Sequence, residues 1–325
     1  MRGVAGAGHS LTGISRARTL IRRLLRKLAN SLPASRGGMK KSLSHIAETQ
    51  AETLRSIQNL ERTFISFASE RMRNPALVDN AFSVAQQEVR NVLRMISPDA
   101  LVDCAKVRVG DAGDGGYIQA EDLAGVARAF SFGIDTNDSW DVQMTRLGIP
   151  VEQFDYSINH PPSTGPLLRF HKLFVSHEAG EGKITVSELL ARHGDSGDAT
   201  YFLKIDIEGA EWDIFDQLSS AHLARFSQIV CEFHDLSRLG EAGFRARAAR
   251  VFAKLNALFA CIHVHGNNCA PLYNVLNIPV PDVIEVSYVL RERHRVCASD
   301  ETFPSRLDHP NSPERPDILL GSFRF

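Results

Sequence analysis

From about residue 98 onward, short apolar runs alternate with longer segments whose apolar residues recur every three to four positions. The first pattern is typical of buried strands and the second of amphipathic helices. The seven predicted strands are residues 127–134, 151–157, 168–176, 200–207, 227–233, 257–265 and 283–290. The clearest predicted helices between them are residues 185–194, 210–220 and 241–256. This alternation predicts a doubly wound α/β domain over residues 98–325, with a mostly parallel sheet.

A helical segment precedes the alternating region. Its apolar residues follow a 3–4–3 spacing, like the a and d positions of a coiled coil, at Ile57, Leu60, Phe64 and Phe67. The run is short, so we expect residues 42–97 to be helical and either to pack on the main domain or to join two copies of the chain through residues 42–72. Pro75 and Pro98 are expected to interrupt helices.

Residues 1–41 are a basic leader. Ten lysine and arginine residues and no acidic residue precede Glu48, although the net charge of the whole chain is −1. Within residues 14–41, leucines and an isoleucine share one helical face and arginines the other, which predicts a cationic amphipathic helix suited to an anionic membrane surface. A leader without a specific partner is an equal alternative, and its composition also matches a mitochondrial transit peptide. Nucleic acid is a less favoured partner because no aromatic residue lies among the basic ones.

Cysteine usage and hydropathy argue against two other classes of protein. The chain has five cysteines, an odd number without a CxxC pair, so we expect no disulfide scaffold and a reducing compartment. No apolar run reaches the length of about 18 residues that a transmembrane helix needs. These features predict a cytoplasmic protein whose leader can attach it to a membrane surface.

The candidate chemistry lies where the predicted strands end, because ligands of open α/β sheets bind beyond the carboxyl ends of the strands. The first central strand ends at Gly133, where the backbone can turn tightly and approach a ligand. Asp155 follows about 20 residues later, where an acidic residue can accept hydrogen bonds from ribose hydroxyls. The single glycine does not make a GxGxxG fingerprint. Both residues also fit an ordinary turn or cap.

The fourth predicted strand is followed by three carboxylates, at Asp206, Glu208 and Glu211. Their mutual repulsion is costly unless a cation or a hydrogen-bond donor offsets it. Acidic residues in the first turn of a helix interact favourably with its dipole, which explains one of them more readily than all three. The strand end is therefore a candidate site for chemistry.

The segment LKIDIEGAEWDIF, residues 203–215, resembles the D-x-E-G-x-E signature of the FkbM-type methyltransferases. Further segments that resemble this family follow the same order along the chain: RVGDAGDGGYI, SFGI with a nearby Ser-Trp, IVCEFH and IHVHGNN. The resemblance covers about residues 100–320 and leaves the N-terminal third unexplained.

The resemblance implies a Rossmann-like class I methyltransferase fold and transfer of a methyl group from S-adenosylmethionine, most often to oxygen. Acceptors in the family include sugars and other hydroxylated small molecules. By position, Phe132, Gly133 and Ile134 would border the methionine part of the cofactor, Asp155 would bind the ribose, and Asp206 would lie at the transfer site.

A hydroxyl acceptor benefits from a base within hydrogen-bond reach. Asp206, Glu208 and His234 are the candidates, since His234 ends the strand after the signature. The residues expected to contact the acceptor are Tyr117, Glu211, His265 and Asn267.

His263 and His265 alternate on one predicted strand and could bind a divalent metal together with Asp206 or Glu208. We favour the simpler interpretation, in which one histidine bonds the backbone and the other packs, and we expect no metal. Two rival functions stay open. One is a metal-dependent glycosyltransferase that reads IDIE as a DxD-like motif. The other is a catalytically silent domain tethered by the basic leader.

Overall fold

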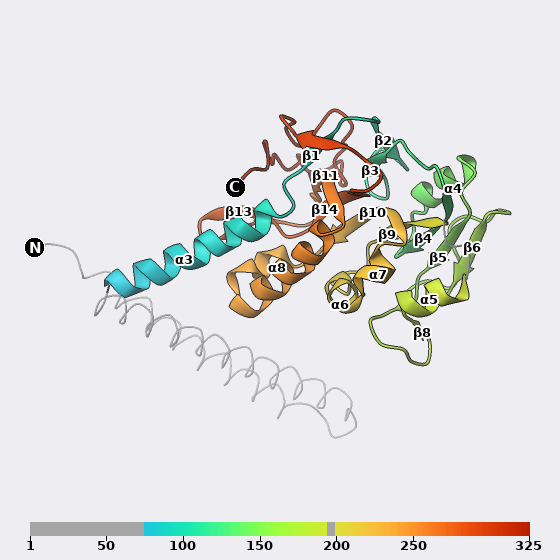
Figure 1. Ribbon diagram of the computed structural model, residues 1–325, viewed down its shortest axis with the longest axis horizontal. Coiled ribbons are helices and arrows are strands. Elements are labelled where there is room, and N and C mark those ends of the chain that lie inside the picture. The colour runs from blue at the N-terminus through green and yellow to red at the C-terminus, as the bar shows by residue number, and fades with distance from the viewer. Residues whose placement is uncertain (1–74, 194–198) are drawn as a thin grey trace, which may run out of the picture. The chain divides into compact units, whose positions relative to one another are not determined.

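The computed structural model describes residues 75–193 and 199–325. Its centre is a seven-stranded sheet with the order β11-β14-β10-β9-β4-β5-β6 (Figure 1). The strands are β4 (Val126–Phe132), β5 (Val151–Phe154), β6 (Leu168–His171), β9 (Thr200–Ile205), β10 (Phe226–Phe233), β11 (Phe259–Gly266) and β14 (Ile284–Leu290). Only β14 pairs antiparallel with its neighbours, β10 and β11. The fold is mixed α/β with a mostly parallel sheet, and each of the seven predicted strands has its counterpart in it.

The helices are α3 (Pro75–Arg94), α4 (Ser139–Arg146), α5 (Val186–Arg192), α6 (Glu211–Gln217), α7 (Ser220–Leu223) and α8 (Ala242–Asn256), with a 3-10 helix, η1 (Leu236–Gly240). The three predicted helices correspond to α5, to α6 and the start of α7, and to α8. Helix α5 begins where it does because Thr185 and Glu188 form a reciprocal capping box. The described part of helix α3 runs from Pro75 to Arg94 and so ends before Pro98, as the sequence predicts.

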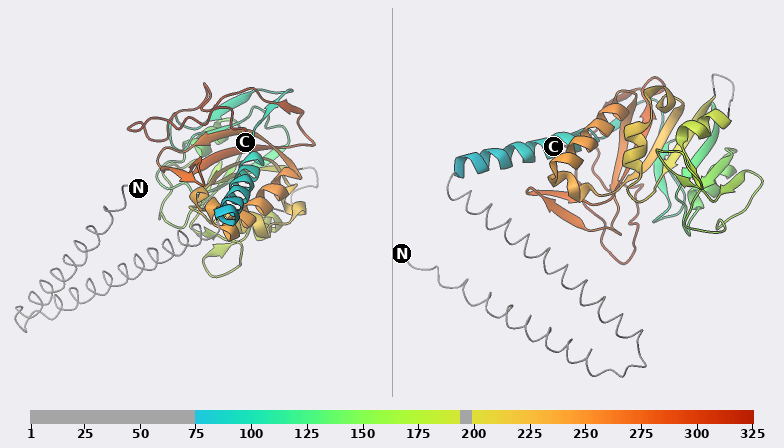
Figure 2. Two further views of the ribbon diagram at one scale, coloured as in Figure 1. Left: turned by 90° about the vertical axis from the view of Figure 1, so that its left-hand side faces the viewer. Right: turned by 90° about the horizontal axis from the view of Figure 1, so that it is seen from below.

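Different elements bury the two faces of the sheet. Trp212 of α6, Phe252 of α8 and Leu93 of α3 belong to the larger apolar cluster, which also includes residues of α5 and α7. Trp140 and Met144 of α4 belong to a separate cluster with residues of β2 and β3. In Figure 1, α5 to α8 lie below the strands and the β2–β3 hairpin lies above them. Seen from below, in the right-hand view of Figure 2, the same helices lie in front of the sheet.

Four small ladders surround the main sheet, and sequence patterns did not predict them. They pair β2 (Lys106–Val109) with β3 (Tyr117–Ala120), β1 (Asp99–Leu101) with β15 (Val296–Ala298), β12 (Leu272–Val275) with β13 (Ile278–Pro281), and β7 (Phe174–Val175) with β8 (Lys183–Ile184). The predicted strand at 168–176 is two strands, β6 and β7, because β7 leaves the main sheet to pair with β8. The β2–β3 hairpin matters most for the site, since it carries Tyr117.

The chain reverses its direction of travel across the sheet between β4 and β9. It builds β4, β5 and β6 outward to one edge and then returns to β9 on the other side of β4. At this point Gly133 has a φ of +75°, and a Cβ atom added to it would lie 1.7 Å from the carbonyl oxygen of Asp206. The carboxyl ends of β4 and β9 therefore meet at a contact that only glycine permits.

Several expectations concern residues outside the described ones: the amphipathic leader within 14–41, pairing through 42–72, and the helical pattern of 42–97 before Pro75. The chain divides into two compact units, Met1–Asn80 and Ala81–Phe325. None of the described helices combines the length and the apolar character that crossing a membrane requires. All five cysteines lie among the described residues and are free.

Candidate active site

Acidic and polar side chains gather beyond the carboxyl ends of β9 and β10. Asp206 follows β9, His234 follows β10, and Glu232 is the second-last residue of β10. Tyr117 reaches the same place from β3, and its hydroxyl lies 3.2 Å from Asp206 Oδ2 and 3.1 Å from Glu232 Oε1. Asn267, which follows β11, donates to Glu232 Oε2 over 3.1 Å. The structure thus brings together four residues that the sequence analysis selected and adds Glu232.

Glu232 is a buried carboxyl group at the centre of this cluster, with 3% of its surface exposed. Burial raises its pKa well above the ordinary value, and the charges of Asp206, Glu285 and Asp114 raise it further. A protonated Glu232 can donate to the Tyr117 hydroxyl, which in turn donates to Asp206. One sequence signal could have identified it, because Glu232 is the only charged residue in the run that forms β10.

Asp206 is the partly exposed carboxylate of the group. Burial raises its pKa; Lys204 and His234 oppose the rise, whereas Glu208 and Asp114 add to it. A carboxylate with a raised pKa is a better proton acceptor than an ordinary one. The Tyr117 hydroxyl bonds to Oδ2 of Asp206. The other oxygen, Oδ1, faces His234 and accepts no hydrogen bond from the described residues.

His234 is held by three carboxylates. Its Nδ1 lies 3.1 Å from Glu211 Oε1, and its Nε2 lies 3.5 Å from Glu208 Oε2 and 3.9 Å from Asp206 Oδ1. Burial lowers the pKa of His234, but the hydrogen bond and charge of Glu211, with the charges of Asp206 and Glu208, outweigh it and raise the pKa to about 9. At neutral pH the imidazole is therefore a cation that offsets part of the acidic cluster, and this disfavours the expectation that His234 is the base.

The protonated His234 makes the stability of the fold depend on pH. Its pKa rises from 6.5 to about 9 on folding, so its stabilising contribution is complete below pH 6.5 and is lost as the pH rises through 9. We expect the free energy of unfolding to fall between pH 6.5 and pH 9. In His234→Gln the fall should be smaller than in the unsubstituted chain, by up to about 3 kcal/mol. Urea unfolding of both proteins at several pH values measures this, and parallel curves would refute the assignment. His265, which titrates in the same range, is common to both proteins.

Glu211 was expected to bind substrate, but its position assigns it another role. Its side chain is fully buried, Oε2 accepts from the Gly209 N–H over 2.9 Å, and Oε1 accepts from the His234 N–H over 2.8 Å. It ties the turn after β9 to the end of β10 and orients the His234 ring. The side chain of Glu208, by contrast, is 87% exposed. Its backbone has a φ of 56°, because the chain turns tightly after β9.

Asp155 braces the loop after β4. Its Oδ2 accepts from the N–H groups of Ile134 and Asp135, each over 2.9 Å, and its Oδ1 accepts from the N–H and hydroxyl of Ser157 over 2.7 and 2.6 Å. A ribose hydroxyl can bond this carboxylate after the Ser157 hydroxyl rotates away, so the predicted contact stays open.

Lys204 of β9 holds the loop at Gly133 by donating a hydrogen bond to the Gly133 carbonyl oxygen. Its Nζ also lies 5.4 Å from the centre of the Tyr117 ring. The Phe132 side chain packs edge to face on Phe154 in the core, so Phe132 can border a ligand only through its backbone. Ile134 is also buried. Of the predicted cofactor loop, the backbone around Gly133 is the part that lies at the sheet edge.

His263 and His265 do not behave as expected. Both bond to carboxylates rather than to the backbone, since His263 Nε2 lies 2.8 Å from Asp308 Oδ1 and His265 lies 3.3 Å from Glu285 Oε2 and 3.0 Å from Asp317 Oδ1. The ring of His263 also packs edge to face on Phe303. Burial lowers the pKa of His263, which its pairing with Asp308 opposes. Burial also lowers the pKa of His265, but Glu285 and the other carboxylates outweigh it and raise the pKa to about 9. Both rings are buried and bonded to carboxylates, so the geometry does not favour contact between His265 and an acceptor.

Two groups among the described residues have the composition and spacing to hold a metal ion. The first is Asp206, Glu232 and His234 in this site, and the second is Asp103, Cys104 and His294 elsewhere. The pair of histidines considered from sequence, His263 and His265, belongs to neither group. An ion in the first group would replace the proton that His234 carries at neutral pH.

Residues 119–257 match the family model described as the methyltransferase FkbM domain. Over this stretch the chain is similar to FkbM methyltransferase domains. The matched stretch runs from the second half of β3 to the end of α8 and contains Asp206, Glu232 and His234. Tyr117 and Asn267 reach the same site from outside the matched residues. No curated protein matches the chain.

Proposed function

We propose that this FkbM-like domain is an S-adenosylmethionine-dependent O-methyltransferase with a Rossmann-like, doubly wound class I fold. The observation that carries the proposal is the Asp206 carboxylate, with its raised pKa, beside the point where the strand order reverses. In open α/β sheets this is where ligands bind. The proposed acceptor is a sugar or another hydroxylated small molecule.

The residues around the site fit this cofactor in two respects. Gly133 lets the loop after β4 pack against the Asp206 carbonyl group, which brings the backbone of that loop next to the Asp206 residue. Asp206 and Glu208 place negative charge where a positively charged sulfonium would lie. S-adenosylmethionine, when bound, supplies an activated methyl group. The predicted contact between Asp155 and the ribose belongs to the same proposal.

The protein's part in the reaction is to orient the acceptor and to take its proton. Asp206 Oδ1 would accept the proton of the acceptor hydroxyl, while the oxygen of that hydroxyl bonds to the methyl group and the bond between the methyl group and the cofactor sulfur breaks. Tyr117 holds Oδ2 and so fixes the plane of the carboxylate. His234, as a cation, opposes the rise in the pKa of Asp206 that burial causes. Lys204 and Asp155 keep the loop at Gly133 in place.

Thermal unfolding with ligands tests the cofactor directly. A ligand at 100 times its Kd stabilises the folded state by about 2.7 kcal/mol. We expect S-adenosylmethionine and its demethylated product to raise the midpoint of unfolding by several degrees, and adenosine to raise it less. If a nucleotide sugar with Mn²⁺ stabilises the protein and S-adenosylmethionine does not, the result favours the glycosyltransferase. In that case Asp206, Glu232 and His234 would hold the ion. No stabilisation by any of them would favour the silent domain.

The proposed setting is cytoplasmic. Attachment to an anionic membrane surface through residues 14–41 and pairing of two copies through residues 42–72 remain proposals based on sequence alone. Strong salt dependence of vesicle binding is the property expected of such a leader.

A further inference from the structure

A second cluster of potential ligands lies at the edge of the sheet opposite the candidate active site. Asp103 and Cys104 follow β1, and His294 lies between β14 and β15. Because β14 runs antiparallel to the central strands, its end lies where those strands begin. Arg293 accordingly donates to the carbonyl oxygen of Ala124, just before β4. This cluster is thus separate from Asp206 and its neighbours.

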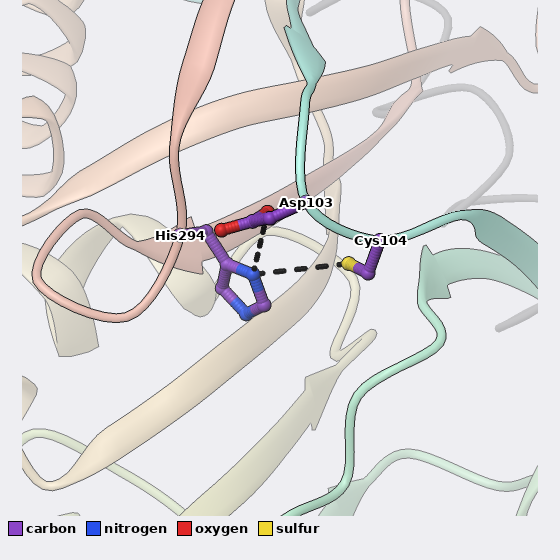
Figure 3. Close-up of side chains that lie close together, drawn as sticks. All are labelled: Asp103, Cys104 and His294. Carbon is purple, nitrogen blue, oxygen red and sulfur yellow. Dashed lines mark hydrogen bonds and ion pairs between the residues drawn. The ribbon is translucent and has the colours of Figure 1, made fainter.

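The reactive atoms of the three side chains converge (Figure 3). His294 Nδ1 lies 3.7 Å from Cys104 Sγ and 3.4 Å from Asp103 Oδ1, and all three ligand atoms lie within 4.8 Å of one another. Zinc bonds to sulfur at about 2.3 Å and to nitrogen or oxygen at about 2.0 Å. In a tetrahedral site these lengths place nitrogen about 3.5 Å from sulfur and about 3.3 Å from oxygen. The observed separations fall close to those values.

Neighbouring groups already orient two of the three ligands. Asp122 Oδ2 lies 3.5 Å from His294 Nε2, on the side of the ring away from the cluster. The Arg295 N–H donates to Asp103 Oδ2 over 2.8 Å, which leaves Oδ1 toward His294. A carboxylate behind a ligating histidine is the usual arrangement in metal sites, because it fixes the ring and its tautomer.

The contacts of His294 leave one ring nitrogen for an ion. With its proton on Nε2, the ring faces Asp122, and Nδ1 presents a lone pair toward Cys104 and Asp103. Without an ion, the Cys104 thiol is the donor in reach of that lone pair, 3.7 Å away. A metal ion between Nδ1, Cys104 and Asp103 would take the place of the thiol proton and keep Nε2–H toward Asp122.

We propose that Asp103, Cys104 and His294 form a zinc site, with water as the fourth ligand. A thiolate, an imidazole and a carboxylate are a ligand set that zinc accepts. His294 is buried, whereas Asp103 lies at the surface and gives an ion a path of entry. The ion would connect the segment after β1 to the loop after β14, which are 190 residues apart in the chain. The site is independent of the proposed methyl transfer.

Cobalt substitution in the full chain tests the site. After removal of metal with a chelator, we expect one equivalent of Co²⁺ to produce a thiolate-to-cobalt charge-transfer band in the near ultraviolet. Cys104→Ser should lose the band, and His294→Gln should weaken Co²⁺ binding at least tenfold. Cys297→Ser is the matched control and should keep the band, since Cys297 is an exposed cysteine on the neighbouring strand β15.

Two results would overturn the proposal. A folded protein that shows no such band would mean that Cys104 and its neighbours do not bind a metal ion through a thiolate. A band that persists in Cys104→Ser would place the metal on another cysteine. Binding at Asp206, Glu232 and His234 cannot be mistaken for this site, because that group has no sulfur ligand.

Discussion

Replacing Asp206 with asparagine is expected to lower kcat for methyl transfer about 1,000-fold, within the range that a positioned base contributes. Asparagine keeps the shape of the side chain but cannot accept the proton of the acceptor hydroxyl. Affinity for S-adenosylmethionine should fall by a much smaller factor, because Glu208 still places negative charge near the proposed sulfonium position. The measurement is formation of S-adenosylhomocysteine with a hydroxylated acceptor that the unsubstituted chain methylates, together with cofactor affinity by calorimetry.

Asp235→Asn is the matched control for this experiment. Asp235 is also a carboxylate beyond the end of β10, but it pairs with Arg238, 48% of its side chain is exposed, and it has a φ of 65°, a conformation that asparagine tolerates. We expect it to retain full activity. Glu208→Gln distinguishes the two remaining candidate bases, Asp206 and Glu208. If kcat falls in Glu208→Gln while Asp206→Asn keeps full activity, Glu208 is the base. Unchanged kcat in both variants would exclude base catalysis by either.

Gly133→Ala is expected to lower the free energy of unfolding by about 3 kcal/mol or more, or to prevent folding. The alanine methyl group would have to occupy a position 1.7 Å from the Asp206 carbonyl oxygen, at a φ of +75°. Relief requires β4 and β9 to separate where the cofactor is proposed to bind. Urea unfolding followed by circular dichroism gives the free energy.

Gly148→Ala isolates the part of this cost that belongs to the backbone. Gly148 also has a positive φ, +86°, but a Cβ there meets nothing within 4 Å. Its substitution should cost about 1 kcal/mol. If the two alanine variants are equally stable, the ends of β4 and β9 do not approach as closely as described.

Much of the fold follows from local patterns. Buried parallel strands read as short apolar runs and amphipathic helices as three-to-four spacing, so the strands of the main sheet were found without knowledge of their neighbours. The order of the strands was not, because pairing depends on contacts distant in sequence. The β2–β3 hairpin was missed since its strands have four residues each and are joined by a glycine-rich loop that resembles an ordinary connection.

The sequence by itself determined that carboxylates follow the fourth predicted strand and that Gly133 ends a strand. It also determined that several segments, in their order along the chain, resemble those of the FkbM methyltransferases. Those features are written in consecutive residues. Only the tertiary structure decided what each carboxyl group does, because pKa values and free lone pairs depend on neighbours from other elements. In the structure, Glu211 and Asp155 accept hydrogen bonds from nearby backbone N–H groups and so hold loops in place. Glu232 joins the site through its hydrogen bond with Tyr117, and Cys104 lies next to His294, 190 residues away in the chain.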